Sequence, residues 1–166
     1  IIEQAECPLV LDADGINALA GHIDVVEKAK YPVILTPHSH EFARICDVPS
    51  TEHREAMASA FAGKHRCVLL LKGHRTIIAD PHGALYQNVH GNPGMAKGGS
   101  GDVLSGIILS LLGQGLDPLA AAACGAYIQS RAGDLCANDI GEFGMTPTDM
   151  LRYIPRVLKP LNSREW

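Results

Sequence analysis

The sequence is poor in aromatic residues and in charge, and it has no long uninterrupted apolar stretch. Only 5% of its 166 residues are aromatic and 19% are charged, whereas 46% are hydrophobic. That balance favours a packed globular chain over a disordered one. The apolar runs at residues 103–112 and 120–128 are bounded or broken by Gly, Gln and Asp, and both fall short of the ~20 residues of a membrane span. We therefore expect a soluble protein without a membrane partner.

Positive charge is also scarce. Fourteen Lys and Arg residues stand against eighteen Asp and Glu residues, for a net charge of −4. This balance argues against a protein that binds the nucleic-acid backbone broadly, although it allows a local basic pocket. We expect no nucleic-acid partner.

Closely spaced cysteine pairs are absent as well. The five cysteines are scattered and include no CxxC pair, which is typical of reduced thiols in a cytoplasmic protein rather than of a disulfide framework. The chain opens with Ile1-Ile2-Glu3-Gln4, which reads like the end of a helix, and not with Met. We expect residues 1–166 to form a single domain that lacks its N-terminal part.

Short apolar runs alternate with helical patterns. Three runs have the length and composition of buried parallel strands: residues 8–12, 32–36 and 67–71. Helical patterns follow them, at residues 14–20, 39–45 and 52–64, the second with Ser39 as its cap and the third with Ala56, Ala60 and Phe61 on one side. Two β-rich runs around a Pro/Gly turn, residues 76–79 and 84–87, predict a hairpin. This alternation predicts an α/β layered fold with a mainly parallel central sheet flanked by helices.

The second half of the chain is helical. A loop at residues 90–101 leads into an apolar helix at 103–112, and Asp117-Pro118 begins another helix in which small residues favour close packing. A last helix is predicted from residue 145 to about residue 158.

Polar side chains follow each of the three predicted parallel strands. They are Asp12 and Asp14, Thr36 and His38, and Lys72. Because ligands of such sheets bind beyond the carboxyl ends of the strands, we expect these residues to converge on one rim. The two aspartates are candidates to orient a ribose, a water or a cation, or to cap the short helix that follows.

The most informative segment is residues 92–102, which is rich in glycine and directly precedes an apolar helix. Glycines let a ligand approach the backbone closely, and the amides of a helix start attract an anion such as a phosphoryl group. Asp102 would then be placed to accept a proton from a hydroxyl that attacks the phosphorus. The alternative is a flexible turn with Asp102 as an ordinary N-cap.

Two other turns carry polar groups. Residues 72–76 follow a strand with two cations and a glycine, which suits nucleotide phosphates or, alternatively, a solvated hairpin entry. In residues 36–41, His38 is a candidate to bind a substrate, with Glu41 in the first turn of the next helix; the alternative is an ordinary strand-to-helix turn. A metal site with His40 lacks a third ligand at a recognisable spacing, so none is predicted. The histidines at positions 22, 53, 65, 82 and 90 are assigned to loops or helix surfaces and given no role.

These motifs occur in the order and spacing of one enzyme family. They are Leu11-Asp12-Ala13-Asp14 with Asn17, Leu35-Thr36-Pro37-His38 with Glu41, Leu71-Lys72-Gly73, and Asn92-Pro93-Gly94-Met95-Ala96 followed by Gly98-Gly99-Ser100-Gly101-Asp102. From about residue 9 to residue 158 the chain resembles the bacterial ADP-dependent NAD(P)H-hydrate dehydratases. These have a ribokinase-like fold and often form the C-terminal domain of a bifunctional nicotinamide-nucleotide repair enzyme.

The resemblance implies a hydro-lyase that restores NADH or NADPH from its hydrate, NAD(P)HX, with ADP or else ATP as phosphoryl donor and with Mg²⁺. Asp102 would be the catalytic base and, with His38 and Glu41, would contact the substrate. The residues implied at the ADP or AMP site are Lys72, Gly73, His74, Arg75, Thr76, Gly98, Gly99, Ser100 and Gly101. Secondary candidates are Asp14, Asn17, Asn92 and Met95. The implied partners are further copies of the chain and an NAD(P)HX epimerase, fused or separate.

The chain departs from the family pattern in a few places. Ser100 stands where Thr is usual, Ser39-His40 replaces Pro-Gly, and Gly15-Ile16 replaces Ala-Leu. The family domain is also longer at its N-terminus, so we expect an open sheet edge that is prone to associate. Two alternatives remain: a ribokinase-like kinase of a small thiazole or pyrimidine alcohol, and a non-catalytic nucleotide-binding fragment.

Overall fold

The computed structural model describes residues 1–48 and 53–159. Within them, five strands form one sheet in the order β1 (Leu9–Leu11), β2 (Val33–Leu35), β3 (Val68–Leu71), β4 (Thr76–Ala79) and β5 (Leu85–Asn88). The first three strands run parallel, with Leu11 opposite Leu35 and Leu35 opposite Leu69. β4 and β5 continue the sheet as an antiparallel hairpin. The three predicted strands and the predicted hairpin are therefore confirmed.

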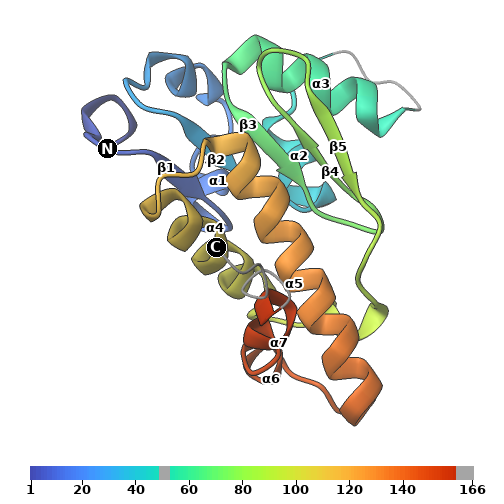
Figure 1. Ribbon diagram of the computed structural model, residues 1–166. Helices are drawn as coiled ribbons and strands as arrows, with labels where there is room; N and C mark the ends of the chain where they lie inside the picture. Colours follow the sequence, from blue (N-terminus) through green and yellow to red (C-terminus); the bar gives the residue numbers. More distant parts are fainter. Residues whose placement is uncertain (49–52, 160–166) are drawn as a thin grey trace.

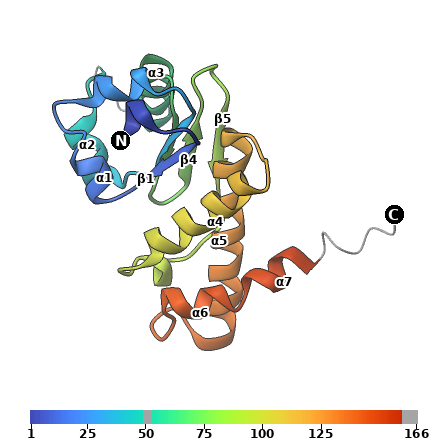
Figure 2. The ribbon, with the colours of Figure 1, turned by 90° about the vertical axis from the view of Figure 1, so that its left-hand side faces the viewer.

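Helices cover both faces of this sheet (Figures 1 and 2). They are α1 (Asp14–Asn17), α2 (Ser39–Ile45), α3 (Arg54–His65), α4 (Ser100–Gly113), α5 (Pro118–Ile140), α6 (Pro147–Leu151) and α7 (Ile154–Leu158), with 3-10 segments η1 (Ile2–Gln4), η2 (Ile23–Lys28) and η3 (Pro93–Met95). Side chains of adjacent strand residues point to opposite faces. Leu35 therefore packs with α1, α2 and α3, whereas Ile34 packs with α4 and α5. This arrangement is the predicted α/β layered fold.

The contact between α4 and α5 depends on a glycine. A Cβ atom at Gly125 of α5 would lie 2.6 Å from Cγ1 of Ile108 on α4, and Ile108 is fully buried. The absence of a side chain at Gly125 lets the two helices approach closely, as the small residues of α5 predicted. Full burial of an Ile side chain contributes about 1.5–3 kcal/mol relative to exposure, so this contact helps to fix α4 against the sheet.

The long helix α5 extends past the sheet and carries α6 and α7 at its far end (Figure 1). A small separate core joins the three helices there: Ala132, Cys136, Met145, Met150 and Tyr153. The prediction of one helix from residue 145 to 158 was wrong, because the helix is interrupted: α6 ends at Leu151 and α7 begins at Ile154. Pro155 explains the break, since proline cannot donate to the carbonyl four residues earlier and its ring collides with it.

Helix α3 also differs in part from its prediction. The predicted start at residue 52 lies outside the described residues, and the helix is described from Arg54. Its buried stripe is Ala58, Phe61, Ala62 and His65, which is the i, i+3, i+4, i+7 spacing of one helix face. From the sequence, Ala56, Ala60 and Phe61 were expected on one side of this helix. Of these three, Phe61 is buried, whereas Ala56 and Ala60 are exposed.

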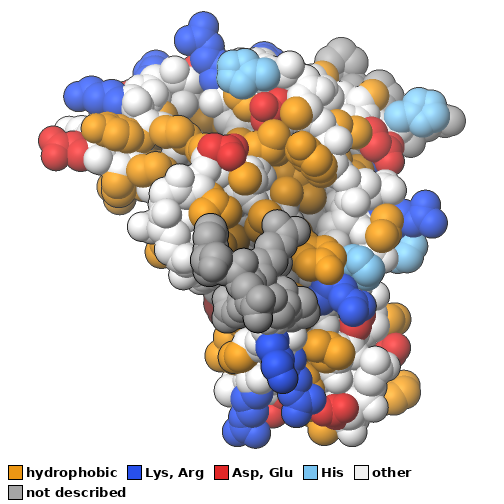
Figure 3. All heavy atoms as spheres, viewed as in Figure 1, with side chains coloured by type: hydrophobic (Ala, Val, Ile, Leu, Met, Phe, Trp, Pro, Cys, Tyr) orange, Lys and Arg blue, Asp and Glu red, His pale blue; other side chains and the backbone are white. Residues whose placement is uncertain are grey.

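Strand β1 is an edge strand whose three residues are half-buried, unlike those of β2, which are fully buried. Hydrophobic side chains gather around the N-terminal segment on the face of the molecule that Figure 3 shows. Across residues 1–48 and 53–159, none of the helices combines the length and the apolar character that a membrane crossing needs.

Candidate functional site

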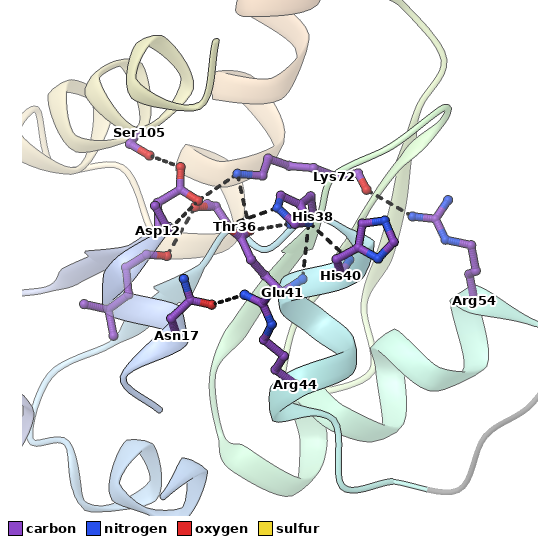
Figure 4. A network of polar contacts seen from close by, with 12 residues as sticks. Asp12, Asn17, Thr36, His38, His40, Glu41, Arg44, Arg54, Lys72 and Ser105 are labelled. Atoms are coloured by element: carbon purple, nitrogen blue, oxygen red, sulfur yellow. Dashed lines mark hydrogen bonds and ion pairs between the residues drawn. The ribbon is translucent and has the colours of Figure 1, made fainter. Parts of the chain in front are cut away.

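The carboxyl ends of β1, β2 and β3 meet at one rim of the sheet (Figure 4). The Lys72 ammonium, just after β3, lies 2.7 Å from Oδ1 of Asp12, just after β1. It also lies 3.9 Å from Oε2 of Glu41 at the start of α2. Thr36, which follows β2, is fully buried and donates to the Leu11 carbonyl at 3.2 Å. The strand-end side chains therefore converge, as parallel strands require.

The first turn of α4 packs directly on this ion pair. A Cβ atom at Gly101 would lie 2.8 Å from Oδ2 of Asp12 and 3.4 Å from Nζ of Lys72. The Ser105 hydroxyl, one turn further along α4, donates to Oδ2 of Asp12 at 3.3 Å. The rim thus places a fixed ammonium beside the amides of a helix start, where partial positive charge is concentrated.

Asp102 lies in that first turn and is exposed. The alternative in which Asp102 is the N-cap is wrong, because the N-cap is Gly99, which has a φ of 94° and no side-chain cap bond. A left-handed φ of this kind is readily adopted only by glycine. Asp102 is thus a helical residue that directly follows Gly101, whose backbone meets the Asp12–Lys72 pair.

The loop before α4 is anchored rather than flexible. The Asn92 side chain accepts from the Gly94 amide at 3.1 Å and donates to Asp134 of α5 at 3.1 Å. A Cβ at Gly94 would lie 2.7 Å from the carbonyl oxygen of Glu142, so backbone approaches backbone here. Met95 fills the space that Gly133 leaves open on α5. Asn92 and Met95 hold this part of the loop against α5.

Further bonds reach the loop from residues that the sequence did not single out. The Lys97 ammonium binds three carbonyl oxygens, of Glu142, Phe143 and Met145. Gln129 of α5 donates to the Ser100 carbonyl at 2.6 Å, and the Ser100 hydroxyl donates to the Met95 carbonyl at 2.6 Å. Gly98 and Gly99 are exposed between these anchors. The start of α4 is therefore held in place by α5 and by the segment that follows α5.

His38 caps α2, so the prediction that Ser39 caps it was wrong. Nδ1 of His38 accepts from the amides of His40 and Glu41, at 3.1 and 3.2 Å. Oε2 of Glu41 in turn accepts from the His38 amide at 2.8 Å, which completes a capping box. Because Nδ1 accepts, the ring proton lies on Nε2, which is 3.4 Å from Oε1 of Glu41. The ring is half exposed and can offer a substrate this N–H donor.

The turn at residues 72–76 is held by Arg54, the first residue of α3. Its guanidinium donates to the carbonyls of Lys72 and His74, at 3.3 and 3.4 Å. The Thr76 hydroxyl donates to the Gly73 carbonyl at 3.2 Å. The side chains of His74 and Arg75 are exposed. Sequence reasoning missed Arg54, since nothing near it marks it as a partner of the turn.

The secondary candidates near α1 lie on the same side of the molecule. Asn17 accepts from Arg44 of α2 at 2.6 Å, and Asp14 is exposed in the first turn of α1. The prediction that an aspartate caps α1 was wrong, because the N-cap is Ala13; Asp12 instead accepts from the Ala13 amide at 2.9 Å. Within the described part of the chain, no group of three or more His, Cys, Asp or Glu side chains could hold a metal ion.

One histidine that was assigned no role is almost completely buried. His65 is 1% exposed, with Nδ1 3.0 Å from Glu27 and Nε2 2.7 Å from Asp47. Burial opposes ionisation of Asp47, but hydrogen bonds from Lys64 and His65 outweigh it and lower the pKa of Asp47. His65 precedes β3, whereas Lys72 follows it. This cluster therefore lies near the amino ends of the strands, opposite the rim, and stabilises the fold there.

The three-layer α/β fold, with a glycine-rich helix start against the carboxyl ends of its strands, is shared with ribokinase-like proteins. A ribokinase-like superfamily protein from Enterococcus faecalis has a similar structure, with a TM-score of 0.73 and 32% identity over 91% of this chain and 52% of that one. The sequence model of the NAD(P)H-hydrate dehydratase family matches residues 1–156. The chain belongs to this family.

Individual relatives agree with that assignment. The bifunctional NAD(P)H-hydrate repair enzyme Nnr of Moorella thermoacetica is 46% identical over 98% of this chain, and that of Thermofilum pendens is 38% identical over 98%. The ADP/ATP-dependent NAD(P)H-hydrate dehydratase of Bacillus subtilis, co-crystallised with ATP and Mg²⁺, has a TM-score of 0.83 and 35% identity over 97% of this chain. The chain spans 31–32% of the two repair enzymes and 57% of the Bacillus protein.

Proposed function

We propose that this chain carries the nucleotide-dependent dehydration of NAD(P)HX to NADH or NADPH, a hydro-lyase reaction that repairs damaged cofactors. The observation that carries the proposal is the placement of Asp102 in the first turn of α4, whose backbone meets the Lys72–Asp12 ion pair at Gly101. Asp102 thus directly follows the position at which the helix-start backbone approaches the Lys72 ammonium. Membership of the NAD(P)H-hydrate dehydratase family supports the same conclusion.

The chemistry uses each of these groups. The ring hydroxyl of NAD(P)HX attacks the terminal phosphorus of ADP, its proton passes to Asp102, and the bond to AMP breaks. The amides of the first turn and Lys72 stabilise the negative charge on the phosphoryl oxygens. The C–O bond of the new phosphate ester then breaks, and phosphate leaves with the electron pair of that bond. Loss of a proton from the neighbouring ring carbon restores the double bond of the reduced nicotinamide.

The position of Asp102 has an electrostatic cost. The helix start that attracts the phosphoryl group also stabilises the ionised carboxylate and so weakens it as a base. A loose, metaphosphate-like transition state reduces this cost, because little proton transfer is needed early. Mg²⁺, when bound with the nucleotide, neutralises phosphate charge and takes most of its ligands from phosphates and water.

The same reasoning extends to donor and partners. We propose ADP as the donor, with ATP as an alternative, since the Bacillus subtilis relative is described as ADP/ATP-dependent. We also propose that residues 1–166 are one dehydratase domain acting with an NAD(P)HX epimerase, because the similar Nnr enzymes are bifunctional and about three times as long. The exposed edge of β1 is the surface through which such a domain would associate with more polypeptide.

Product analysis tests this function. The purified chain is incubated with hydrated NADH, ADP and Mg²⁺, and we expect the absorbance of reduced nicotinamide to recover together with formation of AMP and phosphate. Accumulation of a stable phosphorylated alcohol instead would identify a small-molecule kinase. Binding of ADP without any turnover would identify a non-catalytic nucleotide-binding fragment.

A further inference from the structure

The turn between β3 and β4 has a guanidinium packed against one side of it. Arg54 reaches the turn from α3 and donates to the Lys72 carbonyl (Figure 4). It also donates to the His74 carbonyl, two residues further on. The same guanidinium covers Gly73, where a Cβ atom would lie 3.1 Å from Nη2. The side of the turn that faces α3 is therefore filled.

This contact fixes the direction of the backbone amides. In a planar trans peptide the C=O and N–H groups point in opposite directions. Because the carbonyls of Lys72 and His74 point toward Arg54, the N–H groups of Gly73 and Arg75 point away from it. The carbonyl between them, of Gly73, accepts from Thr76. Three successive carbonyls thus have donors within the protein.

The backbone conformation agrees with an anion-binding turn. Gly73 has a φ of 154° and Arg75 a φ of 58°, and successive N–H groups of a turn can form a concavity that binds an anion. The Lys72 ammonium is already paired with Asp12 and lies near Glu41. Besides that ammonium, the turn offers its backbone amides as phosphate donors.

We infer that Arg54 is a positioning residue that directs the Gly73 and Arg75 amides toward the phosphates of the bound nucleotide. Its own donors are used on carbonyl oxygens, so it does not need to touch the ligand. An arginine suits this role because its planar fork reaches two acceptors at once, which a lysine ammonium does not do in a fixed geometry. The identity of the ligand rests on the proposed function.

Three variants test this role: Arg54→Ala, Arg54→Lys and, as the matched control on the same turn of α3, Glu55→Gln. Glu55 contacts the side chain of Gln87. Calorimetric titration with ADP is expected to show a dissociation constant raised about tenfold by Arg54→Ala, less by Arg54→Lys, and unchanged by Glu55→Gln. In ¹⁵N-edited NMR spectra, ADP should shift the Gly73 and Arg75 amides of the unmodified chain but not those of Arg54→Ala. Millimolar guanidinium should partly restore binding to Arg54→Ala.

Each other outcome decides the matter. Unchanged ADP affinity in Arg54→Ala, or an equal loss in Glu55→Gln, would overturn the positioning role. If the unmodified chain repairs hydrated NADH but ADP leaves both amides unshifted, the role of Arg54 is wrong and the proposed function stands. If ADP shifts both amides and no repair occurs, only the proposed function fails. A chain that binds no ADP would overturn both.

Discussion

Replacement of Gly101 by alanine would distinguish an effect on turnover from an effect on the stability of α4. A Cβ atom there would lie 2.8 Å from Oδ2 of Asp12, so the carboxylate must move by several tenths of an ångström to reach an ordinary contact. Asp12 holds Lys72 at 2.7 Å, and its displacement would carry the ammonium away from the start of α4. Because misplacements of about 1 Å can reduce turnover roughly a hundredfold, we expect Gly101→Ala to lower kcat at least tenfold.

Stability should not fall in parallel. Alanine in place of a helical glycine contributes about 0.5–1 kcal/mol, and the atoms in the way belong to the end of an Asp12 side chain that can shift. Gly106 on the same helix is the control, since a Cβ there meets nothing within 4 Å. Steady-state kinetics and thermal unfolding of both variants make the comparison. Unchanged kcat in Gly101→Ala, or an equal loss in Gly106→Ala, would refute the role given to this contact.

Two further predictions concern residues outside the site. The pKa of Asp47 is lowered in the fold, so its contribution to stability is present above about pH 4 and is lost as the pH falls. Because its side chain is 39% exposed, solvent screens its ion pairs, and Asp47→Asn should reduce the free energy of unfolding by about 0.2–1 kcal/mol at neutral pH, with the difference shrinking in acid; urea titrations that show a constant difference would contradict it. Burial raises the pKa of Cys67 to about 12, so a disulfide reagent should label exposed Cys7 and Cys124 rapidly in the native protein and Cys67 only on unfolding; equal rates would contradict this.

Much of the fold could be predicted because its signals are local. The apolar runs ending at Leu11, Leu35 and Leu71 are strands, and parallel pairing then forces Asp12, Thr36 and Lys72 onto one rim. The glycine-rich segment before α4 was recognisable for the same reason, since its residues are consecutive. Pro155 indicates a helix break in the sequence itself, and the prediction overlooked it.

The remaining features depend on contacts between distant residues. Arg54 bonds to carbonyls 18 and 20 residues away, and Lys97 to carbonyls 45 to 48 residues away. His65 is buried because carboxylates 38 and 18 residues away surround its ring. Carbonyl oxygens are present at every residue and leave no mark in the sequence, so such partners appear only once the chain is folded.

In the proposed reaction, Asp102 accepts the proton of the attacking hydroxyl. The most direct test of this role is the rate at which Asp102→Ala restores reduced nicotinamide from hydrated NADH with ADP, measured beside the ADP affinity of the same variant. We expect turnover to fall by about two to three orders of magnitude while ADP still binds with nearly unchanged affinity. Turnover close to that of the unmodified chain would contradict the claim and remove Asp102 from the mechanism.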